Sequence, residues 1–294
     1  MVLPVTFAVA GTSLSEEEAR FFEQNKPFGF ILFKRNVDHP EQLKTLINDL
    51  KRIAGPDTHI LVDQEGGRVQ RLTEPHWPKY PCMQKCQNEE TLKTTISSIA
   101  KDLTEIGIDI NCAPVLDILQ ENTDVSIGDR AFSDNPSDVA KLGHIACKTF
   151  LENNIQPIIK HLPGHGRAIV DSHDEIPFVT AELDILRKTD FLPFEHVLRQ
   201  FYPYEIWGMV GHCIYTDIDP DLPASLSPKI IGDVIREEIG LSDMLFSDDL
   251  SMGALSAYGD IGTRTKLCLD AGCDIALYCA GKLEDMQQIA SKLS

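Results

Sequence analysis

Short apolar segments rich in β-branched residues alternate along this chain with longer amphipathic segments. The short segments have the length and composition of buried strands. They cover residues 5–10, 29–33, 59–62, 108–113, 157–160, 207–211, 244–247 and 274–278. The pattern therefore predicts eight strands.

The longer segments carry apolar residues three and four positions apart, as helices packed on one face do. Ser15 followed by Glu18 is the spacing of a capping box and predicts the start of an early helix. Further helices are predicted at residues 40–53, 90–106, 136–152, 181–199, 228–239 and 263–271. Strands that are regularly followed by helices indicate a parallel sheet.

Two folds have this alternation. One is a closed (β/α)8 barrel, which typically needs about 250 residues. The other is an open, doubly wound sheet. Eight units in 294 residues and the lack of a GxGxxG string after the first strand favour the barrel. No Pro-, Gly- or Ser-rich linker divides the chain, so we expect one catalytic barrel domain over residues 1–294.

The chain is strongly acidic. Its 27 basic and 45 acidic residues give a net charge of −18, which repels nucleic-acid phosphates and anionic membranes. No apolar run approaches the roughly 20 residues that span a bilayer, and the first residues lack a basic leader. We therefore expect a cytoplasmic protein with neither nucleic acid nor membrane as a partner. Eight cysteines in a chain of this size indicate reduced, structural thiols, and the isolated pair Cys82 and Cys86 does not predict a metal site.

Polar and ionisable residues follow several of the predicted strands. Strand ends of a barrel meet on one rim, where active sites of this fold lie. The relevant strings are DQEGGRVQR at 63–71, GDR at 128–130, KHLPGHG at 160–166, DSH at 171–173 and SDDLSM at 247–252. Asp117 follows the same strand as GDR, and His212 follows the sixth strand. We expect these residues to form one site.

Three of these strings are specific enough to indicate a family. VDQEGGRVQR at 62–71, KHLPGHG with DSH at 160–173, and FSDDLSM at 246–252 resemble glycoside hydrolase family 3. Within it they are most similar to the bacterial β-N-acetylglucosaminidases of peptidoglycan recycling. The resemblance covers nearly the whole chain, with the motifs in the expected order and spacing.

The resemblance also implies the catalytic residues. Asp248 is the expected nucleophile of a retaining enzyme, and His173, oriented by Asp171, is the expected acid and base. An imidazole with a pKa near 6.5 can give a proton to the leaving group and later take one from water. Strand periodicity does not choose between Asp248 and its neighbour Asp249, which point to opposite sides; only the motif favours Asp248.

By the same resemblance, a second set of residues binds the non-reducing sugar. Carboxylates accept hydrogen bonds from hydroxyls while cations donate to them. Gly66 and Gly67 are expected to let the backbone turn tightly beside the ligand. We further expect the cations of this set to make the pocket favourable inside an unfavourable field. The set is Asp63, Arg71, Arg130, Lys160 and His161.

Neighbouring residues have simpler interpretations. We expect Asp117 to cap the next helix, Arg68 to hold its loop by ion pairing, and Trp207 to belong to the core. His212, without a motif partner, is expected to be an ordinary hydrogen-bonded histidine.

The resemblance thus implies an enzyme that removes terminal N-acetylglucosamine from muropeptide fragments, and we expect it to need no metal or cofactor. Three alternatives stay open. The first is a family 3 β-glucosidase with another sugar preference. The second is a metal-dependent barrel hydrolase that uses imidazole and carboxylate ligands. The third is a barrel that binds sugar without turnover. The ligands of the metal alternative would be His161, His165, His173, Asp171 and Asp248.

Overall fold

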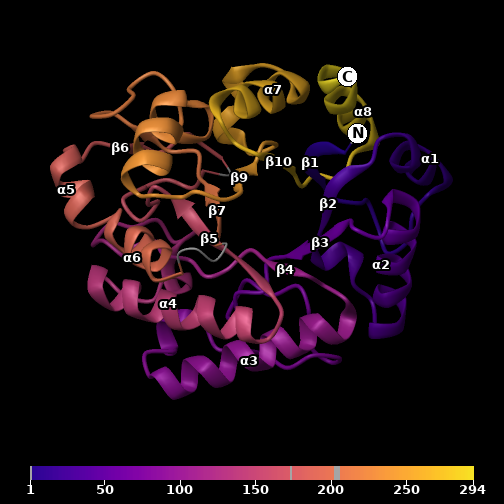
Figure 1. Cartoon of the computed structure of the whole chain (residues 1–294), viewed down its shortest axis with the longest axis horizontal. Coiled ribbons are helices and arrows are strands. Elements are labelled where there is room, and N and C mark those ends of the chain that lie inside the picture. Colours follow the sequence, from indigo (N-terminus) through magenta and orange to yellow (C-terminus); the bar gives the residue numbers. More distant parts are fainter. Residues whose placement is uncertain (1, 173, 202–205) are drawn as a thin grey trace.

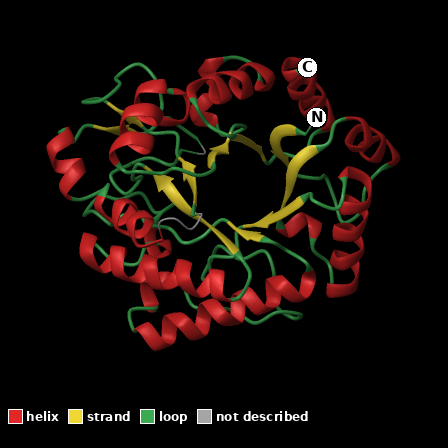
Figure 2. Ribbon diagram, viewed as in Figure 1, coloured by secondary structure: helices red, strands yellow, loops and turns green. Residues whose placement is uncertain are grey.

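The fold is a closed barrel of parallel strands surrounded by helices. The computed structural model describes residues 2–172, 174–201 and 206–294. Within this part of the chain, eight strands close in the order β1-β10-β9-β7-β5-β4-β3-β2. Figure 1 looks down the barrel, and Figure 2 shows the strands enclosed by helices on the outside. The predicted (β/α)8 fold class is confirmed.

The barrel strands agree with the predicted segments, with shifts at their ends. β3 has the predicted bounds, whereas β4 is much shorter than predicted. Pro114 follows β4 closely and has no N–H with which to continue the ladder. The strands are β1 (Leu3–Phe7), β2 (Pro27–Leu32), β3 (His59–Val62), β4 (Ile110–Asn111), β5 (Gln156–Leu162), β7 (Trp207–Val210), β9 (Leu245–Asp249) and β10 (Ile275–Tyr278).

The helices also follow the sequence pattern closely. Helix α1 begins with the predicted capping box, in which Ser15 and Glu18 bond each other's backbone N–H groups. The segment predicted at 228–239 forms the helical element η5 (Ile230–Glu238). The α-helices are α1 (Glu16–Gln24), α2 (Pro40–Ala54), α3 (Glu89–Ile106), α4 (Pro136–Glu152), α5 (Leu183–Lys188), α6 (Leu192–Phe201), α7 (Ile261–Ala271) and α8 (Leu283–Leu293).

One predicted helix is interrupted. The segment 181–199 forms two helices, α5 and α6, because Asp190 and Phe191 turn into the interior between them. Arg167, in the loop after β5, donates from Nε to the carboxylate of Asp190 at 2.8 Å. The apolar spacing continues across the break, so the sequence pattern does not reveal this long-range ion pair.

Two short strands lie outside the barrel. β6 (Phe178–Val179) pairs in parallel with β8 (Ile214–Tyr215). They belong to the loops that follow β5 and β7, and so they tie these two loops together. Neither β6 nor β8 was predicted from the sequence.

Strand side chains on both faces are buried. Ile31, Leu61 and Ile158 point into the barrel with Trp207 and Met209, which confirms that Trp207 is a core residue. The alternate residues pack against the helices in a second, larger cluster. The barrel lumen is therefore filled, and any ligand must bind above it, at the rim.

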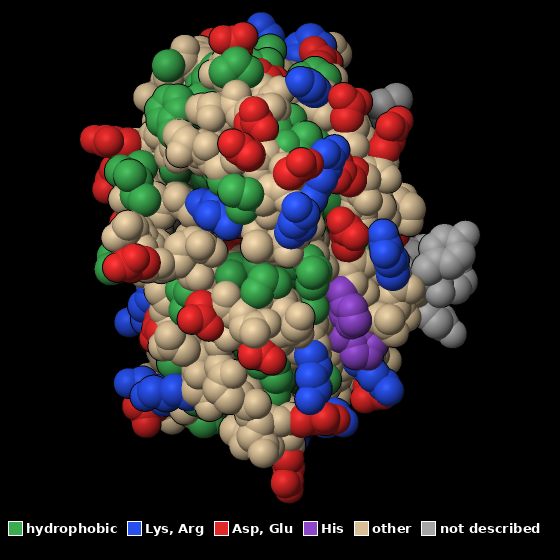
Figure 3. Space-filling view, turned by 90° about the vertical axis from the view of Figure 1, so that its left-hand side faces the viewer, with side chains coloured by type: hydrophobic (Ala, Val, Ile, Leu, Met, Phe, Trp, Pro, Cys, Tyr) green, Lys and Arg blue, Asp and Glu red, His purple; other side chains and the backbone are tan. Residues whose placement is uncertain are grey.

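The surface carries mixed charges. Figure 3 shows one side of the molecule, on which acidic side chains lie among basic ones. Among the residues that the structure describes, no helix is long and apolar enough to cross a membrane.

All eight cysteines are buried and free. The thiol of Cys86 donates to the backbone carbonyl of Cys82 at 3.6 Å. These two cysteines therefore serve local packing of the 82–86 turn.

Candidate active site

A pocket of about 460 Å³ opens at the carboxyl ends of the barrel strands. Ile31, Met209 and Leu277 from the filled lumen form its floor. Its polar walls bring together seven of the predicted site residues, and the eighth, His173, lies outside the described residues. The seven are Asp63, Arg71, Arg130, Lys160, His161, Asp171 and Asp248.

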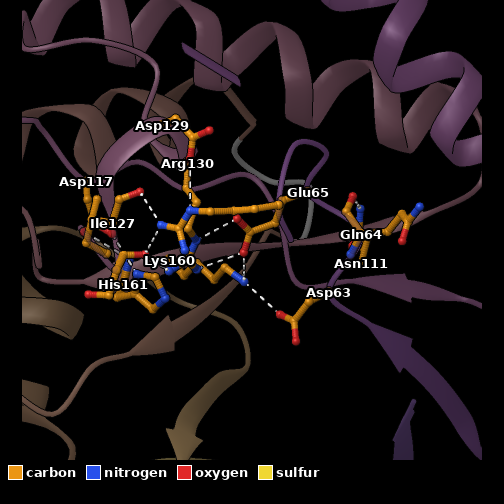
Figure 4. Close-up of polar contacts among 12 residues, drawn as sticks. Asp63, Gln64, Glu65, Asn111, Asp117, Ile127, Asp129, Arg130, Lys160 and His161 are labelled. Carbon is orange, nitrogen blue, oxygen red and sulfur yellow. Dashed lines mark hydrogen bonds and ion pairs between the residues drawn. The ribbon is translucent and has the colours of Figure 1, made fainter. Parts of the chain in front are cut away.

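A buried lysine stands at the centre of the polar wall. Lys160 on β5 is 2% exposed, and its Nζ lies 2.8 Å from Asp63 and 2.7 Å from Glu65 (Figure 4). Burial alone disfavours the ammonium, but the two carboxylates outweigh it and raise the pKa of Lys160. Lys160 is therefore charged and fixed in place.

Glu65 joins this lysine to an arginine. Its carboxylate accepts two hydrogen bonds from Arg130, at 2.8 and 2.9 Å, besides the contact with Lys160. Burial opposes ionisation of Glu65, but the charges of Arg130 and Lys160 outweigh it and lower its pKa to about 2. Glu65 was not among the predicted site residues, although two carboxylates in one string after a strand are a visible signal.

The third predicted cation, Arg71, pairs with Asp63. Its Nη2 lies 3.1 Å from Asp63 Oδ2, and its guanidinium lies over the Phe33 ring at 5.2 Å from the centroid. The cations that were expected to make the pocket favourable are thus matched by carboxylates of the same wall. Each of the three predicted cations is ion-paired, which orients it but cancels much of its field.

Amide side chains fix the strand end that carries these acids. The backbone of Gln64 forms two hydrogen bonds with the Asn111 side chain, at 2.9 and 3.0 Å. The Gln64 side chain in turn accepts from the backbone N–H groups of Arg71 and Leu72. Asp63 and Glu65 flank Gln64 and so have little freedom to move.

The turn that follows needs its two glycines. Gly66 and Gly67 have φ values of 95° and 61°. Residues that carry a Cβ rarely adopt such positive φ values. A Cβ on Gly66 would lie 2.3 Å from the carbonyl oxygen of Pro81, and one on Gly67 would lie 2.6 Å from Cys82 Cβ. The predicted tight turn is thus present.

A buried aspartate holds the histidine beside Lys160. Asp117 Oδ2 lies 2.7 Å from His161 Nδ1, and Oδ1 accepts from the backbone N–H of His165 at 2.6 Å. The next helix, α4, is capped by Asn135 instead. The prediction that Asp117 caps this helix is wrong, because its side chain turns into the barrel rim.

The two aspartates at the end of β9 differ in their surroundings. Asp249 accepts hydrogen bonds from the hydroxyl and backbone of Ser251 and from the backbone of Cys279. Among the described residues, the Asp248 carboxylate accepts a single hydrogen bond, from Asp249 N–H at 2.8 Å. Burial opposes ionisation of Asp248, but His161, His212 and that hydrogen bond outweigh it and lower its pKa.

His212 forms a hydrogen bond to the end of β9. Its Nδ1 lies 2.7 Å from the Ser225 hydroxyl, and its Nε2 lies 3.0 Å from the backbone carbonyl of Asp249. Both ring nitrogens are satisfied, as expected for an ordinary buried histidine.

Arg68 holds the segment 125–127, which lines the pocket. Its guanidinium lies 3.0 Å from Asp129 and also donates to the backbone carbonyls of Val125, Ser126 and Ile127. The predicted role in holding the loop agrees with this geometry, although Arg68 also lines the pocket.

Asp171 lies in the loop after β5, two residues before His173. Its backbone carbonyl accepts from the N–H groups of Asp174 and Glu175.

In the described ranges, no three His, Cys, Asp or Glu side chains gather closely enough to hold a metal ion.

At the carboxyl ends of the strands of this (β/α)8 barrel, one polar pocket combines carboxylates, cations and histidines. These are groups with which a protein can carry out glycoside hydrolysis. The model of the glycosyl hydrolase family 3 N-terminal domain matches residues 5–294. The chain belongs to this family, and the prediction of a glycoside hydrolase is confirmed.

Its relatives in this family have consistent names. A beta-hexosaminidase of Idiomarina loihiensis is 36% identical over 291 residues, which are 97% of this chain and 86% of the relative. A beta-hexosaminidase of Pseudomonas aeruginosa is 34% identical over 275 residues, covering 92% and 80% of the two chains.

Solved structures agree. NagZ from Neisseria gonorrhoeae in complex with N-trifluoroacetyl-D-glucosamine superposes with a TM-score of 0.90 at 32% identity, over 99% of this chain and 85% of that one. The β-N-acetylglucosaminidase of Thermotoga maritima gives a TM-score of 0.85 at 28% identity, over 99% and 61%. The predicted resemblance to bacterial β-N-acetylglucosaminidases is confirmed.

Proposed function

We propose that this protein is a retaining exo-β-N-acetylglucosaminidase with Asp248 as its nucleophile. The observation that carries the proposal is the state of the pocket carboxylates. Asp63 and Glu65 are ion-paired and Asp249 is bound to its own loop, whereas Asp248 accepts a single hydrogen bond within the described part of the chain. A lowered pKa keeps Asp248 ionised at neutral pH, as a nucleophile requires.

In the first step, Asp248 attacks the anomeric carbon as the bond to the leaving oxygen breaks. The imidazolium of His173 gives its proton to that oxygen, and Asp171 stabilises the imidazolium and fixes its orientation. The product is a glycosyl ester on Asp248. In the second step, neutral His173 takes a proton from water, the water oxygen attacks the anomeric carbon, and the Asp248 carboxylate leaves.

Sugar recognition falls to the fixed polar wall. Asp63 accepts from two hydroxyls, while Arg71, Arg130, Lys160 and His161 donate to others. Because the wall is already ion-paired, it needs little reorganisation when the substrate binds. The filled lumen beneath the pocket supports removal of one terminal sugar at a time, since no second ring can extend inward.

The proposed substrates are N-acetylglucosaminyl muropeptide fragments, including anhydro-muropeptides. The relatives named beta-hexosaminidase and the NagZ structures support the acetamido sugar. Free, buried cysteines support a reducing, cytoplasmic setting. We place the whole activity in one catalytic domain, residues 1–294.

The test compares chromogenic N-acetyl-β-glucosaminide and β-glucoside with purified anhydro-muropeptide. We expect release of N-acetylglucosamine, which is lost in Asp248→Asn and insensitive to a chelator. Equal rates on both chromogenic sugars would favour the β-glucosidase alternative. Zinc-restored activity after chelation would favour a metal-dependent hydrolase, and binding without turnover would favour a non-catalytic barrel.

A further inference from the structure

A second histidine lies in the pocket wall with no place in the proposed chemistry. His165 is 3% exposed, and its ring centroid is 5.6 Å from that of His161. Its backbone N–H donates to Asp117, the same carboxylate that binds His161. The backbone of His165 is therefore fixed to the barrel rim.

The ring of His165 faces the loop that carries Asp171. Its Nε2 lies 3.3 Å from the hydroxyl of Ser172, and Ser172 is 5% exposed. Its Nδ1 is buried and has no hydrogen-bond partner among the described residues. The ring also lies close to Gly211, where an added Cβ would meet His165 Cδ2 at 3.2 Å.

Ser172 is also held from the other side. The backbone N–H of Ala254, in the segment η6 (Gly253–Tyr258) after β9, donates to the carbonyl of Ser172 at 3.3 Å. Ser172 is thus attached on two sides. Its hydroxyl contacts His165, just after β5, and its carbonyl binds η6, which follows β9, the strand that carries Asp248. The side-chain contact with His165 is the attachment on the β5 side.

We propose that His165 is a positioning residue that holds the acid–base loop through Ser172. This inference rests on the proposed function, in which Asp171 and His173 flank Ser172 and serve the leaving oxygen. Without the contact, the loop carries its acid less accurately to that oxygen, whereas Asp248 and the sugar-binding wall keep their positions.

Electrostatics agree with a role in positioning. Burial, followed by the charge of His161, lowers the pKa of His165 to about 4, against the opposing carboxylates of Asp117 and Asp248. The ring is neutral at neutral pH and so adds no charge beside the nucleophile.

The test uses the dependence of the rate on the leaving group. A 2,4-dinitrophenyl leaving group needs little protonation, whereas a phenyl group needs much more. We expect His165→Asn and Ser172→Ala each to lower kcat/KM about 10-fold for the phenyl N-acetylglucosaminide but less than about 3-fold for the dinitrophenyl one. The double variant should be no worse than either single variant, since both remove one contact.

Two further variants separate positioning from general damage. His165→Gln can place an amide nitrogen near the Nε2 position and should restore much of the rate, whereas His165→Asn cannot reach it. Ser225→Ala removes a second buried histidine–serine contact, that of His212, away from the loop. Its losses should be equal for both leaving groups.

Equal losses for both leaving groups in correctly folded His165→Asn and Ser172→Ala, checked by thermal unfolding, would overturn the inference. So would additive losses in the double variant. If the wild type itself does not hydrolyse N-acetylglucosaminides, the proposed function fails. A wild type that does so, with leaving-group-independent variants, overturns only the role of His165.

Discussion

The Nζ atom of Lys160 lies 2.7 Å from Oε1 of Glu65, and both side chains are almost completely buried. Glu65 also pairs with Arg130, and Lys160 with Asp63. One continuous ionic chain therefore links the ends of β3 and β5 to the loop after β4. Burial alone would favour the neutral forms of these side chains, and each one keeps its charge because an oppositely charged partner lies beside it.

Removing the central ammonium should break this chain. Lys160→Met should lower the free energy of unfolding by about 3 kcal/mol or more, because two buried carboxylates lose a partner. Urea unfolding measures this. Lys101→Met is the matched control: Lys101 is 73% exposed in a surface pair with Glu105, and its loss should cost less than about 1 kcal/mol. Similar effects in both variants would contradict the assigned role of Lys160.

The same chain should make stability depend on pH. The pKa of Glu65 is about 2 in the folded protein and near 4.5 when unfolded, so its contribution is present above pH 4.5 and is lost as the pH falls toward 2. Between pH 5 and pH 3 the wild type should lose about 2 kcal/mol more than Glu65→Gln. Unfolding by urea at each pH measures the two slopes, and parallel slopes would show that Glu65 is not ionised as described.

Asp117 should support substrate binding through His161. Asp117→Ala removes the 2.7 Å partner of His161 and the acceptor of His165 N–H. We expect KM to rise and the free energy of unfolding to fall by about 3 kcal/mol, since a buried charge-assisted pair is broken. Asp117→Asn keeps the shape of the side chain and one acceptor oxygen. Its rise in KM and its fall in the free energy of unfolding should both be smaller. An unchanged KM in Asp117→Ala would separate His161 from sugar binding.

The glycine turn gives a purely steric prediction. Gly66→Ala would place a Cβ 2.3 Å from Pro81 O at a positive φ, and we expect it to cost about 2 to 3 kcal/mol. Gly232, in η5, has an ordinary φ, and a Cβ added there would meet no atom within 4 Å. Gly232→Ala should therefore stabilise the fold by about 0.5 to 1 kcal/mol. Thermal melts that shift in the same direction for both would contradict this interpretation.

Local patterns were sufficient to predict the barrel. The apolar runs of β3 and the spacing in α4 give those elements their observed bounds, because strand and helix periodicity is a property of neighbouring residues. The break between α5 and α6 depends on the ion pair of Asp190 with Arg167, which joins residues far apart in sequence. No local pattern contains that information.

The sequence predicted which residues line the pocket better than it predicted which side chains pair with one another. The strings placed Asp63, Lys160 and Asp248 correctly at one pocket, because barrel strands end on one rim. Glu65 and Asp117 were missed or misassigned, since the choice between a helix cap and a buried ionic partner depends on side-chain direction. That direction is set by packing across β3, β4 and β5.

In the proposed reaction, Asp248 forms the covalent bond to the sugar. The most direct measurement traps the intermediate with a fluorinated N-acetylglucosaminide that reacts quickly and hydrolyses slowly, followed by peptide mass spectrometry. We predict the mass of one sugar on the peptide that contains Asp248, and no label in Asp248→Asn. A sugar on any other residue, or turnover with inversion and no labelled enzyme, would contradict the account.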